Sequence, residues 1–476
     1  MKRVLKALPA ALLCLSSACS AQALSVLFER ALREEPVYGA AAAARDAAAA
    51  RTQQAFGALL PQLSLSANSN LNRRDYVTRT APPTPSLLDR YNSHAQQLNL
   101  TQPLWRTANT AGLRQAEAVM QQAEQQLLAA QQDLLSKLAS SWFDVLAARD
   151  ALEYAERQLA VTQHQFDVAQ RGADVGSLSL PALVEAQAKH EQALAENLAA
   201  ANEMHIRQAA LEQLVMLPEG LRLASLRDEA SELRFAKPRD AETLAQWLHL
   251  VEANNPHVRA AQQALASAEN ELEKQRAGHQ ATLDLVANYS KNSQAVGGFP
   301  GQAGYDIKQN TIGVQFNLPL FSGGTQSGKV DEALALQRKA RLDLESARRA
   351  AQFASQQAWF NGQAASARAQ AGVQGLRAAQ SAVQTAERSF VLGLKSPLEH
   401  LQALQQLAGA KRDLRKARYE QIGTCFKLRA AAGTLQVDDA LAIDRLFTLG
   451  DEPAQTPSIA PALRSTEASS AIDRGI

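Results

Sequence analysis

QLSLSANSNLN, residues Gln62–Asn72, alternates apolar and polar side chains. Leu63, Leu65, Ala67 and Leu71 occupy alternate positions, and serines and asparagines fill the positions between them. Successive side chains of a β-strand point to opposite faces of its sheet. The pattern therefore predicts a strand with one apolar face and one polar face.

A second stretch with the same alternation, residues 283–291, lies 220 residues further along the chain. Its Leu283 corresponds to Leu63, and at the same offset Pro256 corresponds to Pro36. Each of these strands is followed, after a loop, by a second alternating stretch that ends in a proline motif, QPLW in copy one and LPLF in copy two. Proline cannot donate to a ladder and suits the end of a strand. These second strands are predicted over residues 94–104 and 311–320.

The segments between and after the strands read as helices. Two runs without proline, residues 110–170 and 326–390, are each long enough for a rod of about 90 Å at ~1.5 Å per residue. Heptad spacing within them predicts packing against a neighbouring helix. The heptad positions are Leu138, Val145, Leu152 and Leu159 in the first run, and Ala340, Ala347 and Ala354 beside Leu344, Ala351, Ala358 and Ala365 in the second. An ordinary coiled coil without a pore would explain these helices but gives the strands no role.

Each long helix is followed by a turn that contains glycine and proline and by a returning helix, which predicts a helical hairpin. The chain is thus predicted to contain two copies of helix, strand, strand, long helix and returning helix. Repeat 1 covers residues 24–216 and repeat 2 covers 241–433, with first helices at 25–60 and 241–280 and returning helices at 182–215 and 398–432. A linker, 217–240, joins them, and 434–476 is predicted to be irregular and to end in a disordered tail rich in Pro, Ser, Ala and Thr.

Residues 1–23 read as a signal peptide, with a basic start, an apolar stretch and the small-x-small site Ala21-Gln22-Ala23. A membrane anchor is the alternative, although the apolar run is shorter than the ~20 residues of a spanning helix. Lipidation of Cys19 is a second alternative. Outside this segment the only cysteine is Cys425, so no intrachain disulfide framework is possible.

Composition argues against a nucleic-acid partner and for long helices. The formal net charge is +2, and removal of the signal peptide with its three basic residues leaves 46 basic against 47 acidic residues. Aromatic residues make up only 5% of the chain, whereas alanine, glutamine, leucine and glutamate are abundant. No stretch after the signal peptide reads as a transmembrane helix, so any membrane crossing is predicted to use a β-barrel.

Four strands with one apolar face cannot stand alone in a membrane, because two edges of unpaired backbone groups would face lipid. Two chains would give eight strands with a filled interior, and three would give twelve strands around an aqueous lumen. The predicted fold is an α+β membrane protein with a trimeric barrel continued by long helices. The residues predicted to line the lumen are Ser64, Ser66, Asn68, Asn99, Thr101, Asn288, Gln315 and Asn317.

The duplicated order of elements, with its Asn255-Pro256 motif, its proline-ended strands and its arginine-to-glycine turns, resembles TolC-like outer-membrane efflux proteins over about residues 25–433. The resemblance implies a homotrimer in the outer membrane with most of the chain in the periplasm. It implies a twelve-stranded barrel, an α-helical tunnel closed at its inner end, and equatorial segments near 217–240 and after residue 433. It also implies two partners, a periplasmic adaptor and an inner-membrane ABC or proton-driven transporter.

The family's gate lies at the hairpin ends. Six positions after Gly393 its type member has an acidic residue that forms a ring in the trimer, and this chain has Glu399 there. Gln402 replaces the acidic residue of a second ring, Lys395 replaces a latch arginine, and Phe390 replaces its aromatic hydroxyl partner. We expect Glu399 to form a cation-attracting constriction. A solvated helix charge is the alternative.

In the first hairpin the acidic latch partner is expected six positions after Gly176, where this chain has Ala182, and Glu185 lies nearby. The resemblance therefore places the periplasmic gate at Gly176, Glu185, Gly393 and the three residues Lys395, Glu399 and Gln402.

Enzyme chemistry is not indicated. The glycines between the strands of repeat 2 do not open a helix after a strand, as a phosphate-binding loop would. No catalytic residue, cofactor or metal site is predicted, and a coiled-coil envelope protein or adhesin without a pore is the alternative function. Protein cargo, as in type I secretion, and small molecules both suit the predicted channel. The histidines, which form no HExxH motif or close cluster, are His94, His164, His190, His205, His249, His257, His279 and His400.

Overall fold

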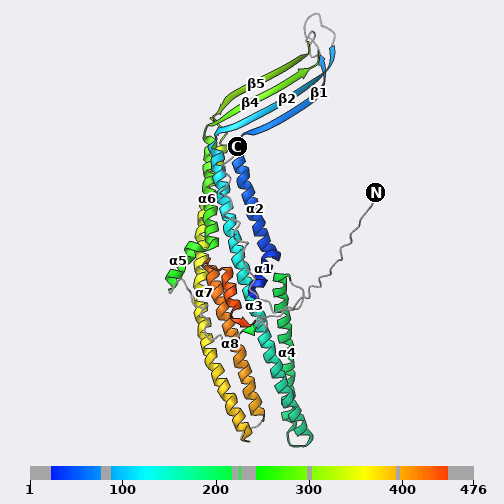
Figure 1. The fold of residues 1–476 in the computed structure, drawn as a ribbon, viewed down its shortest axis with the longest axis vertical. Helices are drawn as coiled ribbons and strands as arrows, with labels where there is room; N and C mark the ends of the chain where they lie inside the picture. The colour runs from blue at the N-terminus through cyan, green and yellow to red at the C-terminus, as the bar shows by residue number, and fades with distance from the viewer. Residues whose placement is uncertain are drawn as a thin grey trace, which may run out of the picture.

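The computed structural model describes residues 23–76, 87–216, 225–226, 243–296, 303–392 and 397–448. Both repeats contain the same series of elements (Figure 1). Repeat 1 consists of α1 (Leu24–Glu34), α2 (Pro36–Gly57), β1 (Gln62–Tyr76), β2 (Leu87–Trp105), α3 (Thr107–Asp174) and α4 (Leu180–Val215). Repeat 2 consists of α5 (Leu244–Asn254), α6 (Pro256–Arg276), the short 3-10 helix Ala277–His279, β4 (Thr282–Gln294), β5 (Tyr305–Asn317), α7 (Thr325–Val391) and α8 (Pro397–Ala431). The remaining elements are α9 (Val437–Asp444) and the two-stranded pair β3 (Ser225–Leu226) and β6 (Phe447–Thr448).

The four long strands form one antiparallel sheet at one end of an elongated molecule, and the helices run away from it as a long bundle (Figure 1). The order in the sheet is β1-β2-β4-β5, so β2 of repeat 1 pairs with β4 of repeat 2. The hairpins α3-α4 and α7-α8 reach the opposite end of the molecule (Figure 1). The sheet and the hairpin ends are therefore the two extremes of the chain.

The predicted strands 62–72, 94–104 and 283–291 fall within β1, β2 and β4. The range 311–320 was wrong at both ends, because β5 begins at Tyr305 and ends at Asn317, before Pro319. In repeat 1 the proline does not end the strand: β2 continues to Trp105, with an irregularity in its pairing to β4 between Pro103 and Trp105.

The first predicted helix of each repeat is split in two by its proline. Glu35 and Asn255 both adopt extended backbone conformations immediately before Pro36 and Pro256. The carboxylate of Glu35 accepts a hydrogen bond from the backbone N–H of Tyr38 at 2.7 Å. The side chain of Asn255 likewise caps α6. The single helices predicted at 25–60 and 241–280 are therefore wrong, because each proline starts a new, capped helix.

The segment predicted to be irregular after residue 433 contains α9 and β6. The tail after residue 450, the signal peptide through residue 22 and most of the linker 217–240 lie outside the described residues.

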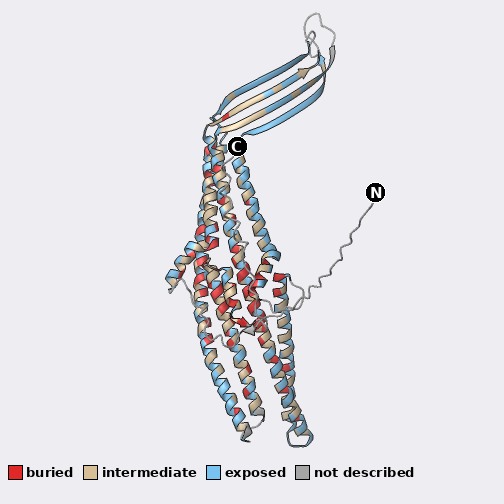
Figure 2. Cartoon of the chain, in the orientation of Figure 1, coloured by how far each residue is buried: buried red, intermediate tan, exposed pale blue. Residues whose placement is uncertain are grey.

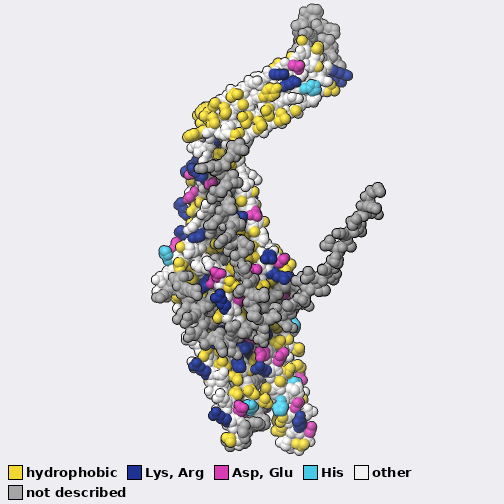
Figure 3. Space-filling view, viewed as in Figure 1, with side chains coloured by type: hydrophobic (Ala, Val, Ile, Leu, Met, Phe, Trp, Pro, Cys, Tyr) yellow, Lys and Arg dark blue, Asp and Glu magenta, His cyan; other side chains and the backbone are white. Residues whose placement is uncertain are grey.

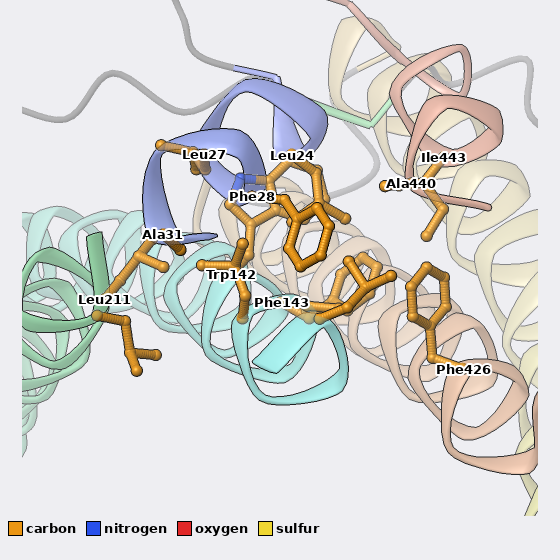
Figure 4. Packing of buried hydrophobic residues seen from close by; sticks show 14 of the residues in the cluster. Leu24, Leu27, Phe28, Ala31, Trp142, Phe143, Leu211, Phe426, Ala440 and Ile443 are labelled. Carbon is orange, nitrogen blue, oxygen red and sulfur yellow. The ribbon is translucent and has the colours of Figure 1, made fainter. Parts of the chain in front are cut away.

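The main hydrophobic core lies midway along the bundle, where buried residues are concentrated (Figure 2). Side chains from α1, α3, α4, α8 and α9 meet there around Trp142 (Figure 4). The ring of Trp142 is fully buried and packs edge-on against Phe447 at a centroid distance of 4.5 Å. The carboxylate of Asp444 accepts hydrogen bonds from the backbone N–H groups of Leu24 and Ser25 at the start of α1. The two ends of the described chain thus belong to one core.

A second cluster attaches α5 to the long helices of repeat 2. Trp247 and Val251 of α5 are buried against Ala351 and Ala358 of α7 and against residues of α8. The predicted heptad column that contains Ala351 and Ala358 is therefore in a helix–helix seam. In the neighbouring predicted column, Ala354 is exposed, whereas Ala340 and Ala347 are partly buried.

Within the described ranges, every helix lacks an apolar run of the length needed to span a membrane.

Candidate functional site

The pairing register places the polar residues of the four strands in common rows. Ser64 of β1 is opposite Asn99 of β2, Asn99 is opposite Asn288 of β4, and Asn288 is opposite Thr311 of β5. Residues directly opposite each other in a sheet point to the same face. The amide of Asn288 donates a hydrogen bond to the side-chain oxygen of Asn99, which links the two repeats across their shared strand boundary.

All the residues predicted to line a lumen lie on this one face. The register pairs even-numbered residues of β1 and β4 with odd-numbered residues of β2 and β5. The predicted lumen residues have even numbers in β1 and β4 and odd numbers in β2 and β5, so they share one face. The structure thus brings together side chains that are up to 253 positions apart in sequence, from Ser64 to Asn317. The polar-face residues so grouped are Ser64, Ser66, Asn68, Asn99, Thr101, Asn288, Gln315 and Asn317.

The opposite face of the sheet is apolar and exposed in the single chain. The exposed fraction is 74% for Leu65, 79% for Ile312 and 65% for Phe316. Figure 3 shows the corresponding band of hydrophobic side chains across the part of the sheet nearest the helices. Exposed apolar surface of this extent marks contact with lipid or with another protein.

Two aromatic residues mark the helix end of this band. Trp105 follows Pro103 at the end of β2, and Phe321 follows Pro319 after β5. Their exposed fractions are 64% and 90%. Rings in this position are typical of the aromatic girdle at a membrane–water boundary. The proline motifs thus hold a large ring where each strand turns into its long helix.

A partly buried ion pair joins the sheet to the helices. Arg106, between β2 and α3, donates two hydrogen bonds to the carboxylate of Asp284 on β4, at 2.8 and 2.6 Å. The side chain of Asp284 is only 8% exposed and that of Arg106 is 40% exposed. Sequence reasoning missed this pair, because neither residue belongs to a motif and their partnership depends on the pairing of β2 with β4.

A second polar contact links the two repeats lower down the bundle. Asp150 of α3 is buried and accepts hydrogen bonds from the hydroxyl of Tyr419 at 2.9 Å and from Arg415 at 3.2 Å, both on α8. Burial and the neighbouring Asp150 carboxylate raise the pKa of Tyr419. The pattern of charged residues on long helices did not distinguish this buried acid from the solvated ones around it.

At the first hairpin end, Gly176 adopts a left-handed conformation, with φ +73°. Glycine takes this conformation without the steric cost that a side chain adds. Glu185, on α4, pairs with Lys189 at 2.6 Å, which lowers the pKa of its carboxyl group. The structure therefore gives Glu185 a partner on its own helix.

At the second hairpin end, Glu399 lies exposed in the first turn of α8, and Gln402 lies exposed one turn later. Residues three apart lie on the same side of a helix. Gly393 and Lys395 lie outside the described residues. Glu185 and Glu399 belong to different hairpins.

In the described part of the chain, no cluster of three or more His, Cys, Asp or Glu side chains has the geometry of a metal site.

Comparisons with known proteins match nearly the whole chain. A family model described as outer membrane efflux protein matches residues 27–215 and 247–434, which correspond to the two repeats. The outer membrane protein TolC of Vibrio cholerae serotype O1 is 29% identical over 436 residues, covering 91% of this chain and 96% of the relative. The proteases secretion protein PrtF of Dickeya chrysanthemi is 28% identical over 437 residues, covering 90% of this chain and 92% of the relative. The fold is similar to that of the Campylobacter jejuni CmeC outer membrane channel, with a TM-score of 0.72 at 16% identity, covering 88% of this chain and 89% of that one.

Proposed function

This chain belongs to the outer membrane efflux protein family, and from that premise we propose that three copies of it form the outer-membrane channel of a tripartite export system. The observation that carries the proposal is the sheet, which has a polar face, an apolar face and two open edges. An apolar face toward lipid and a polar face toward water are what a transmembrane barrel requires. The long helices then extend the channel into the periplasm.

The open edges support closure between copies. β1 leaves the helices and β5 returns to them, so β5 of one copy beside β1 of the next continues the antiparallel order. Closure removes edges that would otherwise expose unpaired backbone groups to lipid. Four strands from each of three copies give a twelve-stranded barrel with room for an aqueous lumen.

In this assembly the row Ser64, Asn99 and Asn288 lines the lumen of the barrel, together with the other polar-face residues. The predicted lumen residues are neutral, and the charged residues of the same face include both signs, with Arg74 opposite Asp89 and Asp284 paired with Arg106. The barrel therefore presents hydrogen-bonding groups without a strong net charge. Such a lining allows cargo of either charge to pass and leaves charge selection to another part of the channel.

We place that selection at the hairpin ends. Threefold repetition of Glu399 at the start of α8 gives a ring of carboxylates, with Gln402 one turn above it. The proposed gate also includes Gly176 in the turn of the first hairpin, Glu185 on α4, and Gly393 and Lys395, which precede Glu399 in the sequence. The exposure of Glu399 and Gln402 in the single chain supports this assignment.

The partners in this proposal are a periplasmic adaptor and an inner-membrane transporter of the ABC or proton-driven type. The relative PrtF is named for the secretion of proteases, which supports a secreted protein as one class of cargo. Small molecules are the other class. No enzymatic step is part of the proposal, since transport through a channel requires none.

The test is conductance of the purified full-length protein in planar lipid bilayers, with the mass of the assembly measured by native mass spectrometry. The proposal predicts discrete channel openings and the mass of a trimer. A coiled-coil adhesin, the competing function, predicts no conductance. Absence of conductance from a preparation that inserts into bilayers as a trimer would contradict the proposal.

A further inference from the structure

Two pairs of like charges face each other across strands near the loop end of the sheet. Lys291 of β4 is directly opposite Lys308 of β5, and Arg73 of β1 is directly opposite Arg90 of β2. Directly opposite side chains in a sheet have Cβ atoms about 5 Å apart, and like charges at that spacing are destabilising. A bound anion would offset the repulsion in each of these two pairs.

Both pairs lie on the apolar side of the sheet. Lys291 is two residues beyond Tyr289, and Arg73 is two residues beyond Leu71, so each shares the face of its apolar neighbour. All four side chains are exposed, and none forms an ion pair with another described residue. Figure 3 shows basic side chains over the sheet beyond the hydrophobic band, toward the loops. We call Lys291, Lys308, Arg73 and Arg90 the basic belt.

The distance from the helix end of the apolar band to the basic belt matches the thickness of a membrane. Lys308 is eight residues from Phe316, and Arg73 is ten residues from Leu63, where Phe316 and Leu63 lie at the helix end of the apolar band. At ~3.3 Å per residue and a tilt of ~40°, these separations are about 20 and 25 Å along the membrane normal. The apolar band of an outer-membrane barrel is ~25 Å tall. The aromatic residues after the strands mark one boundary, and the basic belt marks the other.

Resting on the proposed function, which orients the loops outward, we propose that the basic belt binds the phosphate groups of glycolipid headgroups in the outer leaflet of the membrane. The belt carries four positive charges per chain, against the two acidic residues Asp75 and Asp306 on the same face. In a closed barrel β5 of one copy adjoins β1 of the next, so lysine and arginine pairs alternate around the circumference. Phosphate oxygens accept charge-assisted hydrogen bonds from two cations at once, which explains why the charges occur in opposed pairs.

Charge for solubility is the competing explanation for these residues. It requires no particular anion, and it does not account for the placement of both pairs at one boundary of the apolar band. The two explanations differ in whether binding of a lipid to the belt depends on the phosphate groups of that lipid.

The test compares the wild-type trimer with the variant Arg73→Gln, Arg90→Gln, Lys291→Gln, Lys308→Gln in detergent micelles. Native mass spectrometry measures binding of bis-phosphorylated lipid A and of lipid A from which both phosphates have been removed. A charge-matched control replaces four exposed basic residues of α7 with glutamine, namely Lys329, Arg338, Arg341 and Arg377. A further sample contains inorganic phosphate as a competitor.

We expect the wild type and the control to bind the phosphorylated lipid at least about tenfold more tightly than the dephosphorylated lipid, since one basic residue near an anionic surface contributes about a fivefold gain. The belt variant should lose this preference, and inorganic phosphate at millimolar concentration should not displace the lipid. Equal binding of both lipids by the wild type, or a preference that survives in the belt variant, would overturn the inference. Displacement by inorganic phosphate alone would identify a free-anion site and would also overturn it. Conductance of the belt variant in neutral bilayers tests the channel separately, because channel activity does not depend on this lipid.

Discussion

Replacement of Arg106 with alanine should weaken the junction between the sheet and the helices. The guanidinium donates two hydrogen bonds to Asp284, whose side chain is 8% exposed. Removal of one partner from a buried pair costs about 3–5 kcal/mol, because the other charge stays buried without compensation. Arg106 itself is 40% exposed, so solvent screening reduces the expected loss in the free energy of unfolding to about 2–3 kcal/mol.

The matched control is Arg114→Ala. Arg114 lies in the first turns of α3 and pairs with Glu273 at 3.6 Å, with both side chains about three-fifths exposed. Exposed pairs of this kind contribute about 0–1 kcal/mol. Denaturant unfolding of the detergent-solubilised protein, followed by circular dichroism, measures both variants.

A second substitution separates the ion pair from packing effects. The double variant Arg106→Gln, Asp284→Asn removes both charges together, and we expect it to recover most of the stability lost in Arg106→Ala, since no charge is left buried alone. Equal losses for Arg106→Ala and Arg114→Ala, or no recovery in the double variant, would refute the assignment of this pair as the junction.

Three further substitutions test other parts of the molecule. Glu399→Ala should make multivalent cations about tenfold weaker blockers of the single-channel current, because a ring of carboxylates attracts such cations. The control is Glu196→Ala, which changes an exposed glutamate of α4. Unchanged block in Glu399→Ala would contradict the gate assignment. Tyr419→Phe should reduce the loss of stability that the wild type shows at alkaline pH. The pKa of Tyr419 is raised in the folded state, so the stabilisation by its protonated hydroxyl is complete below the ordinary pKa of about 10 and is lost as pH rises through the folded pKa. A series of thermal melts in which wild type and variant lose stability equally with pH would exclude this role. Trp247→Ala should lower the free energy of unfolding by about 3–5 kcal/mol, because the ring of this α5 residue is buried. Hydrogen exchange should then show that α5 has detached from α7. Amide protection in α5 equal to that of the wild type would disprove the anchoring role of Trp247.

The alternation of side chains was sufficient to predict the strands and their two faces. Ser64 and Asn317 could be assigned to the same face before the register was known, because period-two alternation fixes each strand's faces and the apolar sets must agree across a sheet. The long helices were equally predictable, since each contains more than sixty residues without proline.

The features that the sequence did not reveal depend on partners far away in the chain. Asp284 and Asp150 look like ordinary acidic residues on a polar strand face and a charged helix. Their burial and their contacts with Arg106 and Tyr419 arise from the packing of distant segments. The helix α9 was missed because it is eight residues long and is held by packing against the main core rather than by its own periodicity.

The most direct test of the channel is thiol accessibility at adjacent positions of one strand. Ser66→Cys places a thiol on the polar face and Leu65→Cys places one on the apolar face of β1. The native Cys425 is buried, and burial raises the pKa of its thiol, so it reacts slowly. If the polar face lines the pore, a charged water-soluble thiol reagent lowers the single-channel conductance of Ser66→Cys and leaves that of Leu65→Cys unchanged. Conductance that falls in Leu65→Cys and not in Ser66→Cys would contradict the assignment of the two faces.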